Sequence, residues 1–268
     1  MASTALPVAS PRAPSARRTV PGIGTTLPAS DGPKGDRTLQ RHACRIRALC
    51  LPIAFTDQQA KQFDALVAHR TSLKRSETLY RAGEPFHALY AIETGSLKTV
   101  ILSEDGRVQV IGYHMPGDII GFDGMGSDNH GAEAIALEDT EASALPFGSI
   151  QSLARTMPAL QHHLHRMMST LIARDQGVML MLGSMHADER VAGFLLTLAE
   201  RNRCCGQSST ECVLRMTREE IGSYLGLKLE TVSRLLSRFQ ALGLIEVQGR
   251  ALKLLDPVAL KRMGGQRG

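Results

Sequence analysis

Short apolar runs that alternate with turn residues dominate the chain from residue 78 to residue 125. The runs read TLYRAGEPF, LYAIETGSLKTVIL, SEDGRV and QVIGYHMPGDIIGFDGM. Glycines punctuate them at Gly83, Gly95, Gly106, Gly112, Gly117 and Gly121. Short strands separated by frequent turn signals are typical of all-β sandwiches and barrels. We therefore predict a sandwich or a jelly-roll-like barrel in this part of the chain.

A helical pattern follows, because apolar residues recur every three or four positions from residue 158 to residue 185. This spacing predicts one helix of about 28 residues, which is long for a globular protein. A seam so apolar predicts coiled-coil-like pairing of two copies, and the alternative is simple packing against the β domain. The expected dimer contact comprises Leu164, Met168, Leu171, Ile172, Asp175, Met179 and Leu182.

Two further segments have a helical period. TDQQAKQFDALVAHR, residues 56–70, places Phe63, Leu66 and Val67 on one face, and ADERVAGFLLTLAERNR, residues 187–203, follows the long helix. Residues 1–38 are rich in Pro, Ser, Ala, Thr and Arg and show no hydrophobic period. Such a composition buries too little apolar surface to offset the entropy of ordering, so we expect a disordered tail.

The stretch TREEIGSYLGLKLETVSRLLSRFQ, residues 217–240, predicts two short helices joined by a tight turn. Thr217 and Glu220 have the spacing of a capping box, and Gly226 suits a left-handed helix end. A second helix starts near Lys228, and its apolar stripe comprises Val232, Leu235, Leu236 and Phe239. This is the layout of a helix-turn-helix, whose second helix lies in the major groove of DNA.

Glu230, Ser233 and Arg234 point the same way from the second helix, because they lie at positions i, i+3 and i+4. Arginine donates to guanine, glutamate accepts from cytosine, and serine bonds a base edge or a phosphate. Further DNA contacts are expected from Lys228, Ser237, Arg238, Thr217, Arg250 and Lys253. LIEVQGRALKLL, residues 244–255, predicts a hairpin wing. An ordinary amphipathic hairpin is the alternative, but the wing and the basic flanks favour double-stranded DNA as the partner.

Composition narrows the function further. The chain has 268 residues, enough for two domains, and a formal net charge of +5, which suits a nucleic-acid partner. It has no apolar run of membrane-spanning length and no signal-peptide pattern, so we expect a cytoplasmic protein with no membrane partner. No Ser-His-Asp set, phosphate-binding glycine loop or complete metal constellation is apparent, so we do not expect an enzyme.

These motifs together resemble the Crp/Fnr superfamily, and in particular its FNR branch of anaerobic regulators. The resemblance covers about residues 44–255 and is carried by LYAIETGSLKT, IGYHMPGDIIGFDGMGS, RDQGVMLML and IGSYLGLKLETVSRLLSRFQ. It implies an α+β fold with an N-terminal β-roll sensor domain like a cyclic-nucleotide-binding domain, a long dimerisation helix and a C-terminal winged helix-turn-helix. It also implies a homodimer, RNA polymerase as a partner, and TTGAT-type half-sites read through Glu230, Ser233 and Arg234.

The corresponding division of the chain is a disordered tail at 1–38, a β-roll sensor domain at 39–157, a dimerisation helix at 158–185 and a DNA-binding domain at 186–268. The cyclic-AMP branch carries an Arg-Ser pair after its Gly-Glu phosphate loop. Here that region reads GDIIGFDGMGSDNHGAEA, which lacks the pair. We therefore expect no cyclic nucleotide.

FNR proteins bind a [4Fe–4S] cluster through three cysteines in an N-terminal C-x2-C-x5-C run and one in the β-roll. The resemblance matches Cys44 and Cys50 to the last two of the run, whereas Arg41 and Ser143 stand at the other two positions. His42, Asp139 or Glu138 would have to complete a mixed ligand set, because such a cluster takes four ligands. An iron–sulfur cluster, a reversible Cys44–Cys50 disulfide and plain thiols remain alternatives.

Asp175 falls where the FNR branch places an acidic residue on the dimer helix. Two carboxylates facing each other across the seam would weaken dimerisation, and a solvated outer-face carboxylate is the alternative. The sequence therefore predicts a homodimeric transcription regulator of the FNR type that responds to oxygen or redox state. A regulator without its own cofactor that is controlled by its abundance, or a small-molecule-binding sensor module, is the competing interpretation.

Overall fold

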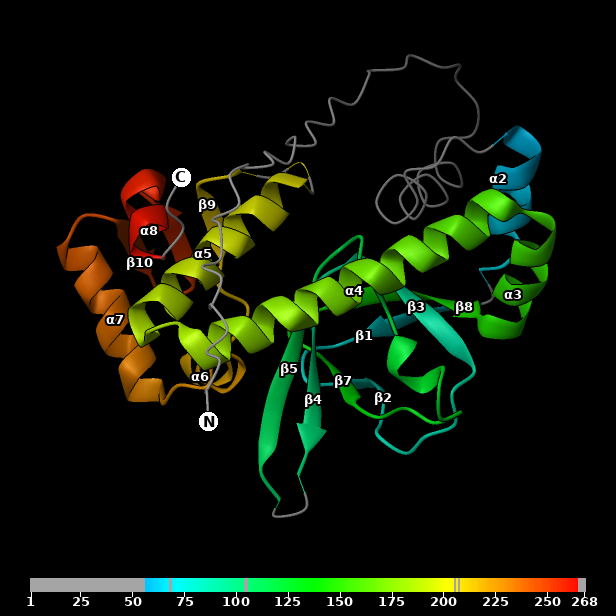
Figure 1. Ribbon diagram of the computed structural model, residues 1–268, viewed down its shortest axis with the longest axis horizontal. Coiled ribbons are helices and arrows are strands. Elements are labelled where there is room, and N and C mark those ends of the chain that lie inside the picture. Colours follow the sequence, from blue (N-terminus) through cyan, green and yellow to red (C-terminus); the bar gives the residue numbers. More distant parts are fainter. Residues whose placement is uncertain (1–55, 68, 104–105, 205, 207, 265–268) are drawn as a thin grey trace, which may run out of the picture. The chain divides into compact units, whose positions relative to one another are not determined.

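The computed structural model describes residues 56–67, 69–103, 106–204, 206 and 208–264, and its first half is built of β-strands (Figure 1). One antiparallel sheet has the strand order β1 (His69–Leu73), β8 (Thr140–Pro146), β3 (Ala88–Thr94) and β6 (Ile119–Ile120). A second has the order β2 (Thr78–Tyr80), β7 (Glu133–Ala136), β4 (Leu97–Leu102) and β5 (Val108–His114). The predicted all-β region is thereby confirmed. The expected tail at 1–38 lies outside the described residues.

Apolar side chains from both sheets meet between them and form the core of the β domain. This cluster comprises Leu73, Tyr80, Ile92, Leu97, Ile120, Ala134 and Ala136. A second cluster on the first sheet includes Leu89 of β3, Leu145 of β8 and side chains of the flanking helices α2 (Asp57–Asp64), α3 (Phe147–Thr156) and α4 (Pro158–Ser184). Helices therefore cover a sheet whose apolar residues would otherwise be exposed.

The helix expected over residues 56–70 is shorter than its periodicity suggested. α2 starts from a capping box between Thr56 and Gln59 and ends at Asp64. His69–Leu73 instead forms β1, which pairs along its whole length with β8. Pairing with a distant strand overrides the local helical pattern, and Leu66 and Val67 still pack against the cluster that contains Phe63 of α2.

α4 is the expected long helix, with 27 residues and a proline in its first turn. The C-terminal domain that follows contains α5 (Ala187–Cys204), α6 (Arg218–Leu225), α7 (Leu229–Ala241) and α8 (Pro257–Met263). Its three-stranded sheet has the order β10 (Ile245–Gln248), β11 (Ala251–Leu254) and β9 (Glu211–Val213), so the predicted wing hairpin is present. Within the described part of the chain, every helix is too short or too polar to cross a bilayer.

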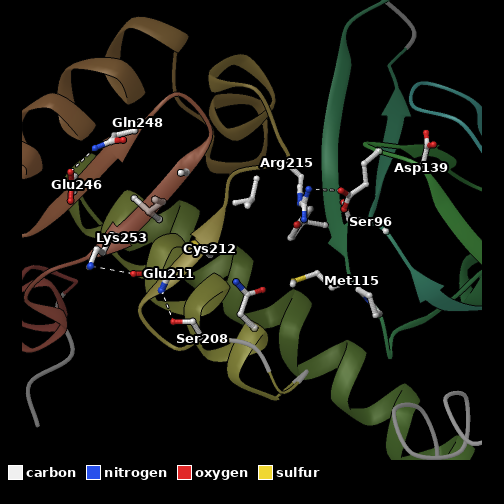
Figure 2. Close-up of a pocket in the computed structure, with 18 residues that line it drawn as sticks. Ser96, Met115, Asp139, Ser208, Glu211, Cys212, Arg215, Glu246, Gln248 and Lys253 are labelled. Atoms are coloured by element: carbon white, nitrogen blue, oxygen red, sulfur yellow. Dashed lines mark hydrogen bonds and ion pairs between the residues drawn. The ribbon is translucent and has the colours of Figure 1, made fainter. Parts of the chain in front are cut away.

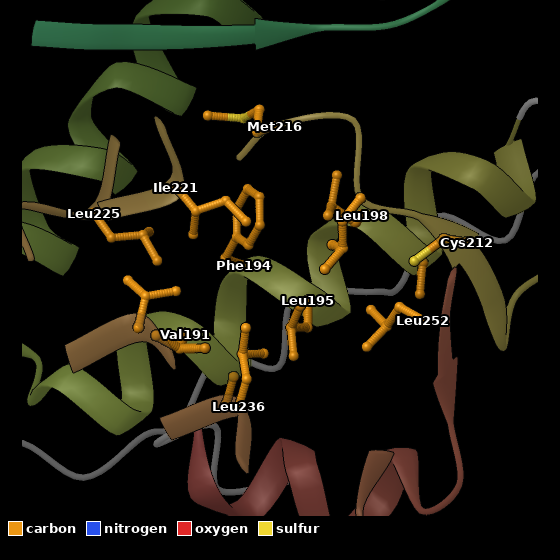
Figure 3. Packing of buried hydrophobic residues seen from close by; sticks show 14 of the residues in the cluster. Val191, Phe194, Leu195, Leu198, Cys212, Met216, Ile221, Leu225, Leu236 and Leu252 are labelled. Carbon is orange, nitrogen blue, oxygen red and sulfur yellow. The ribbon is translucent and has the colours of Figure 1, made fainter. Parts of the chain in front are cut away.

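The core of the C-terminal domain lies between α5, the helix pair α6–α7 and the wing. Figure 3 shows Val191 and Leu195 of α5 beside Leu225 of α6, Leu236 of α7 and Leu252 of β11. The same cluster includes Val100, Val110, Tyr113, Met115 and Leu137 of the β domain. The described residues all belong to one compact unit, and this cluster is its shared interior.

Candidate DNA-binding surface and dimer helix

The first helix of the helix-turn-helix, α6, is fixed at both ends by its own residues. The Thr217 hydroxyl accepts from the backbone N–H of Glu220 at 3.1 Å, and the Glu220 carboxylate accepts from the backbone N–H of Thr217 at 2.6 Å. Gly226 ends the helix in the left-handed conformation, with φ of 64°. The capping box and the glycine end expected from the sequence are both present, so the turn into α7 has a defined angle.

α7 buries its apolar stripe and leaves its polar face open. Val232, Leu236 and Phe239 are buried, whereas Glu230 and Arg234 are exposed and Ser233 is half-buried between them. The remaining predicted contact residues Thr217, Lys228, Ser237, Arg238, Arg250 and Lys253 are also exposed. This arrangement brings the predicted base-contacting side chains together on an accessible face, as a recognition helix requires.

Two of the predicted phosphate contacts already have acidic neighbours. Arg238 lies 3.8 Å from the Asp188 carboxylate of α5, and Lys253 lies 3.1 Å from the Glu211 carboxylate on the neighbouring strand β9. Arg250 lies in the tight turn between β10 and β11 and is exposed. Lys253 and Arg238 would exchange a surface ion pair for a phosphate on binding DNA, which reduces the gain from each contact.

α4 has two apolar faces about 100° apart, because their residues are one position apart along the helix. The inner face packs within the chain: Leu160 is buried, Leu164 and Met167 contact the β-domain cluster, and Met181 contacts the C-terminal core. The outer face is exposed and comprises Ile172, Asp175, Met179 and Leu182, with Met168 half-buried. Leu164 and Leu171, predicted for the dimer contact, belong to the inner series.

Sequence reasoning missed the contact between the helix-turn-helix and the β4–β5 hairpin. Lys98 of β4 places Nζ 2.6 Å from the Glu220 carboxylate. On β5, the backbone N–H of Val110 donates to the Ser223 hydroxyl at 2.8 Å, and the Gln109 amide donates to the Ser223 carbonyl. Pairs more than 100 positions apart leave no local signal in a sequence, so only the folded structure reveals them.

Two arginines reinforce this domain contact. Arg174 of α4 and Arg201 of α5 both donate to the Tyr113 carbonyl, at 2.7 and 2.8 Å, and Arg201 also pairs with Asp118. A cavity of about 620 Å³ remains between the wing and the β domain (Figure 2). Arg215 and Glu138 both line it and form an ion pair with a separation of 2.5 Å. Several hydrogen bonds and ion pairs therefore join the C-terminal domain to the β domain.

Comparison with known proteins identifies this arrangement. Residues 189–263 match the family described as the Crp-like helix-turn-helix domain, and residues 70–157 match the cyclic nucleotide-binding domain. The chain is 42% identical over 224 residues to the transcriptional regulatory protein btr of Bordetella pertussis, covering 84% of this chain and 93% of that protein. The chain belongs to the Crp/Fnr family. It lies in the FNR-like branch and is a DNA-binding transcription regulator, not an enzyme.

Other members of the Crp/Fnr family support this placement. The transcriptional activator protein Anr of Pseudomonas protegens is 40% identical over 222 residues, which cover 83% of this chain and 91% of that protein. Among solved structures, FixK2 from Bradyrhizobium japonicum matches with a TM-score of 0.70 and 32% identity, over 76% of this chain and all of that one. The expected α+β fold with a β-roll, a long helix and a winged helix-turn-helix is thereby confirmed.

The Crp/Fnr β-roll domain retains a cavity of about 400 Å³ against α4, and its lining suits an anion poorly. Two acidic residues, Asp123 and Asp175, line it against one basic residue, Arg174, one N–H of which donates to the Tyr113 carbonyl. Burial lowers the pKa of His114 to about 3, so this imidazole is neutral at physiological pH. The lining therefore offers little to neutralise a cyclic phosphate, which supports the expectation that no cyclic nucleotide binds.

The residue at the β-roll ligand position of FNR proteins has a different environment here. Ser143 is fully buried on β8, opposite Arg70 of β1, and its hydroxyl donates to the buried Glu93 carboxylate. Arg70 Nε lies 3.4 Å from one Glu93 oxygen, and the other oxygen has no hydrogen-bond partner. A hydroxyl beside a carboxylate supplies hard oxygen donors where a cluster iron takes a thiolate.

The acidic residues suggested as substitute ligands lie elsewhere. The Asp139 carboxylate is 2.7 Å from Lys74 Nζ, and Glu138 pairs with Arg215 and accepts from Ser96. Asp139 precedes Ser143 by four positions, just before β8 begins, and four residues span about 13 Å along an extended chain. Arg41, His42, Cys44 and Cys50 lie outside the described residues. The β-roll donors that the structure does describe therefore do not fit a four-thiolate cluster.

Proposed function

We propose that two copies of this protein pair along the outer face of α4 and read palindromic TTGAT-type half-sites. The observation that carries this proposal is the accessible polar face of α7, with Glu230 and Arg234 exposed on either side of the half-buried Ser233, together with an exposed apolar seam on α4. A two-fold dimer presents two recognition helices to two half-sites of opposite orientation, so a palindromic site matches its symmetry.

The signal in this proposal is oxygen or redox state. The protein acts in the cytoplasm, where it regulates transcription through contact with RNA polymerase. Relatives named anaerobic regulatory protein, such as that of Pasteurella multocida with 39% identity, support the signal. Cys44 and Cys50 are the residues proposed to carry it, as cluster ligands or as a reversible disulfide.

A second candidate is favoured by the buried Ser143–Glu93 pair. Because the β-roll lacks a thiolate at this position, a regulator without its own cofactor would be controlled by its abundance alone. The two candidates share the same DNA site and differ only in their response to oxygen.

Fluorescence anisotropy with a TTGAT-N4-ATCAA duplex tests the shared part. The expected result is binding that exceeds binding to a scrambled duplex by about 1000-fold or more. Equal affinity for both duplexes would overturn the proposed site. Repeating the titration with and without oxygen, for wild type and for Cys44→Ser and Cys50→Ser, separates the candidates. An oxygen effect that both substitutions abolish supports redox sensing, and equal affinities in every preparation support control by abundance.

A further inference from the structure

The cavity of about 620 Å³ between the β domain and the wing has acidic residues on both of its walls. Glu138 and Asp139 belong to the β-domain wall, and Glu211 of β9 and Glu246 of β10 belong to the opposite wall. Figure 2 shows Asp139 on one side of the cavity and Glu211 and Glu246 on the other. A molecule with a positive charge at each end would therefore meet carboxylates on both sides.

The lining between the two acidic pairs is largely apolar. Met115 follows β5, Cys212 lies on β9 and Leu252 lies on β11, and all three line the cavity and are buried. In the view of Figure 2, Met115 and Cys212 lie between Asp139 and Glu211. Methylene groups are stabilised by contact with such side chains. This pattern suits an aliphatic chain that carries a cation at each end.

Two of the four carboxylates are available to a ligand. Glu246 has no ion-pair partner among the described residues, and it accepts a hydrogen bond from the Gln248 amide at 2.7 Å. Asp139 pairs with Lys74, but these side chains are 70% and 76% exposed, so another cation can replace the lysine at little cost. Each wall therefore offers one carboxylate to a ligand cation.

The other two carboxylates have basic partners on the lining. Arg215 lies 2.5 Å from Glu138, and Lys253 lies 3.1 Å from Glu211. The lining thus combines four acidic residues with two basic ones. This excess of negative charge favours a cationic ligand and disfavours an anion.

A buried amide without a partner lies at the same cavity. Asn202 of α5 lines it and is only 6% exposed. Within the part of the chain that the structure describes, its side-chain amide forms no hydrogen bond. Burying an amide without a hydrogen bond costs free energy, so a ligand N–H that reaches the Asn202 oxygen removes this cost. This amide is evidence for a polar ligand that is independent of the acidic residues.

We propose that the cavity binds a linear aliphatic diamine. One ammonium group pairs with Asp139 and the other with Glu246, the carbon chain packs against Met115 and Cys212, and Asn202 accepts from an ammonium N–H. The cavity volume is within the range of small-molecule sites. Because the ligand contacts both the β domain and the wing, its binding stabilises the folded arrangement of the two. The site lies within one chain, so it depends neither on DNA nor on a dimer.

Isothermal titration calorimetry of the full chain without DNA tests this site. The probes are 1,4-diaminobutane and 1,6-diaminohexane, and 1-aminobutane and 1-aminohexane are the controls of equal length with a single charge. The better diamine should bind at least about tenfold more tightly than its monoamine, because the second ammonium adds a charge-assisted contact. It should also raise the unfolding temperature. Diamines that bind no more tightly than their monoamines overturn the proposal.

Variants assign the binding to the two walls. Asp139→Asn and Glu246→Gln each remove one carboxylate and should each weaken the diamine about tenfold or more, because hydrogen bonds to charged groups are lost. Asn202→Leu removes the amide at similar volume and should also weaken it. Glu219→Gln, which neutralises an exposed acidic residue of α6 outside the cavity lining, should bind like wild type.

The outcomes separate this inference from the proposed function. Diamine binding that is unchanged in both Asp139→Asn and Glu246→Gln overturns the site, because the ligand then binds elsewhere. If a variant does not fold, the comparison of diamine with monoamine on wild type still decides. Failure of the diamine site leaves the TTGAT titration unaffected, and failure of that titration leaves the diamine site unaffected.

Discussion

Lys98 Nζ lies 2.6 Å from Glu220 Oε1 and thereby joins strand β4 to the first helix of the helix-turn-helix. Both side chains are largely buried, with exposed fractions of 17% and 20%. The other Glu220 oxygen accepts from the backbone N–H of Thr217. One carboxylate therefore caps α6 and also anchors this helix to the β domain.

The first prediction concerns this ion pair and pH. Burial raises the pKa of Glu220, but the hydrogen bonds from Lys98 and from the backbone of Thr217 outweigh burial and hold it below its usual value. A carboxyl whose pKa is lowered on folding stabilises the protein at neutral pH, and this contribution is lost as pH falls through the folded-state pKa. The thermal unfolding temperature of wild type, measured from pH 7 downwards, should fall as Glu220 becomes protonated. The unfolding temperature of Lys98→Met should fall by a smaller amount over the same pH range.

The matched control for Lys98→Met is Lys253→Met, which removes an exposed lysine–glutamate pair. Lys253 and Glu211 are 50% and 62% exposed, so their pairing should contribute little. If the two variants show the same pH dependence as wild type, the Lys98–Glu220 pair has no special role in holding the domain.

The second prediction concerns base recognition. Arg234→Ala should weaken binding to the TTGAT duplex by about 1–3 kcal/mol and relax the preference at the contacted guanine. Anisotropy titrations with duplexes altered at each half-site position measure both effects. Arg250→Ala removes a predicted phosphate contact instead, so it should weaken all duplexes alike and flatten the salt dependence. A uniform loss for Arg234→Ala would contradict its role in reading bases.

The third prediction concerns the seam of α4. Ile172 is 59% exposed in the single chain, and Ile172→Glu would place a carboxylate in the dimer contact. This variant should sediment as a monomer and lose operator binding. Ala173→Glu adds the same charge one position along the helix, outside the seam, and should remain a dimer. An intact Ile172→Glu dimer would place the interface elsewhere.

The fourth prediction concerns Asp175, which is exposed and lies on the same seam. If the two Asp175 carboxylates of a dimer repel each other, Asp175→Ala should lower the dimer dissociation constant and raise DNA occupancy in air. The gain should shrink with added salt, because salt screens exposed charges. Sedimentation at several salt concentrations measures it. A dissociation constant equal to that of wild type at every salt concentration would show that repulsion between the Asp175 carboxylates does not weaken the dimer.

Local chemistry explains why the helix-turn-helix could be predicted closely. The Thr217–Glu220 capping box, the Gly226 helix end and the stripe with Val232 and Phe239 are set by residues near one another in the chain. The same holds for α4, whose apolar repeat extends over most of its length. These features were predicted from the sequence and appear in the fold.

Tertiary pairing explains what could not be predicted. β1 includes His69 and Arg70, the last two residues of the predicted helix, because β8 pairs with it. The inward orientation of Leu164 depends on a β-domain surface that the helix sequence does not encode. Ser143 contacts Glu93, which lies on a strand 50 positions earlier in the chain. Periodicity identifies an apolar face of a helix but does not say which neighbour covers it.

The cluster shared by the β domain and the C-terminal domain has a consequence during protein synthesis. Val100 and Val110 lie on the β4–β5 hairpin, yet they are buried against residues of α5, α6 and the wing. Because the ribosome makes the hairpin first, these side chains stay without their neighbours until the last part of the chain has emerged. A nascent chain halted before α5 would expose an apolar hairpin, so chaperone binding and aggregation should depend on where translation pauses.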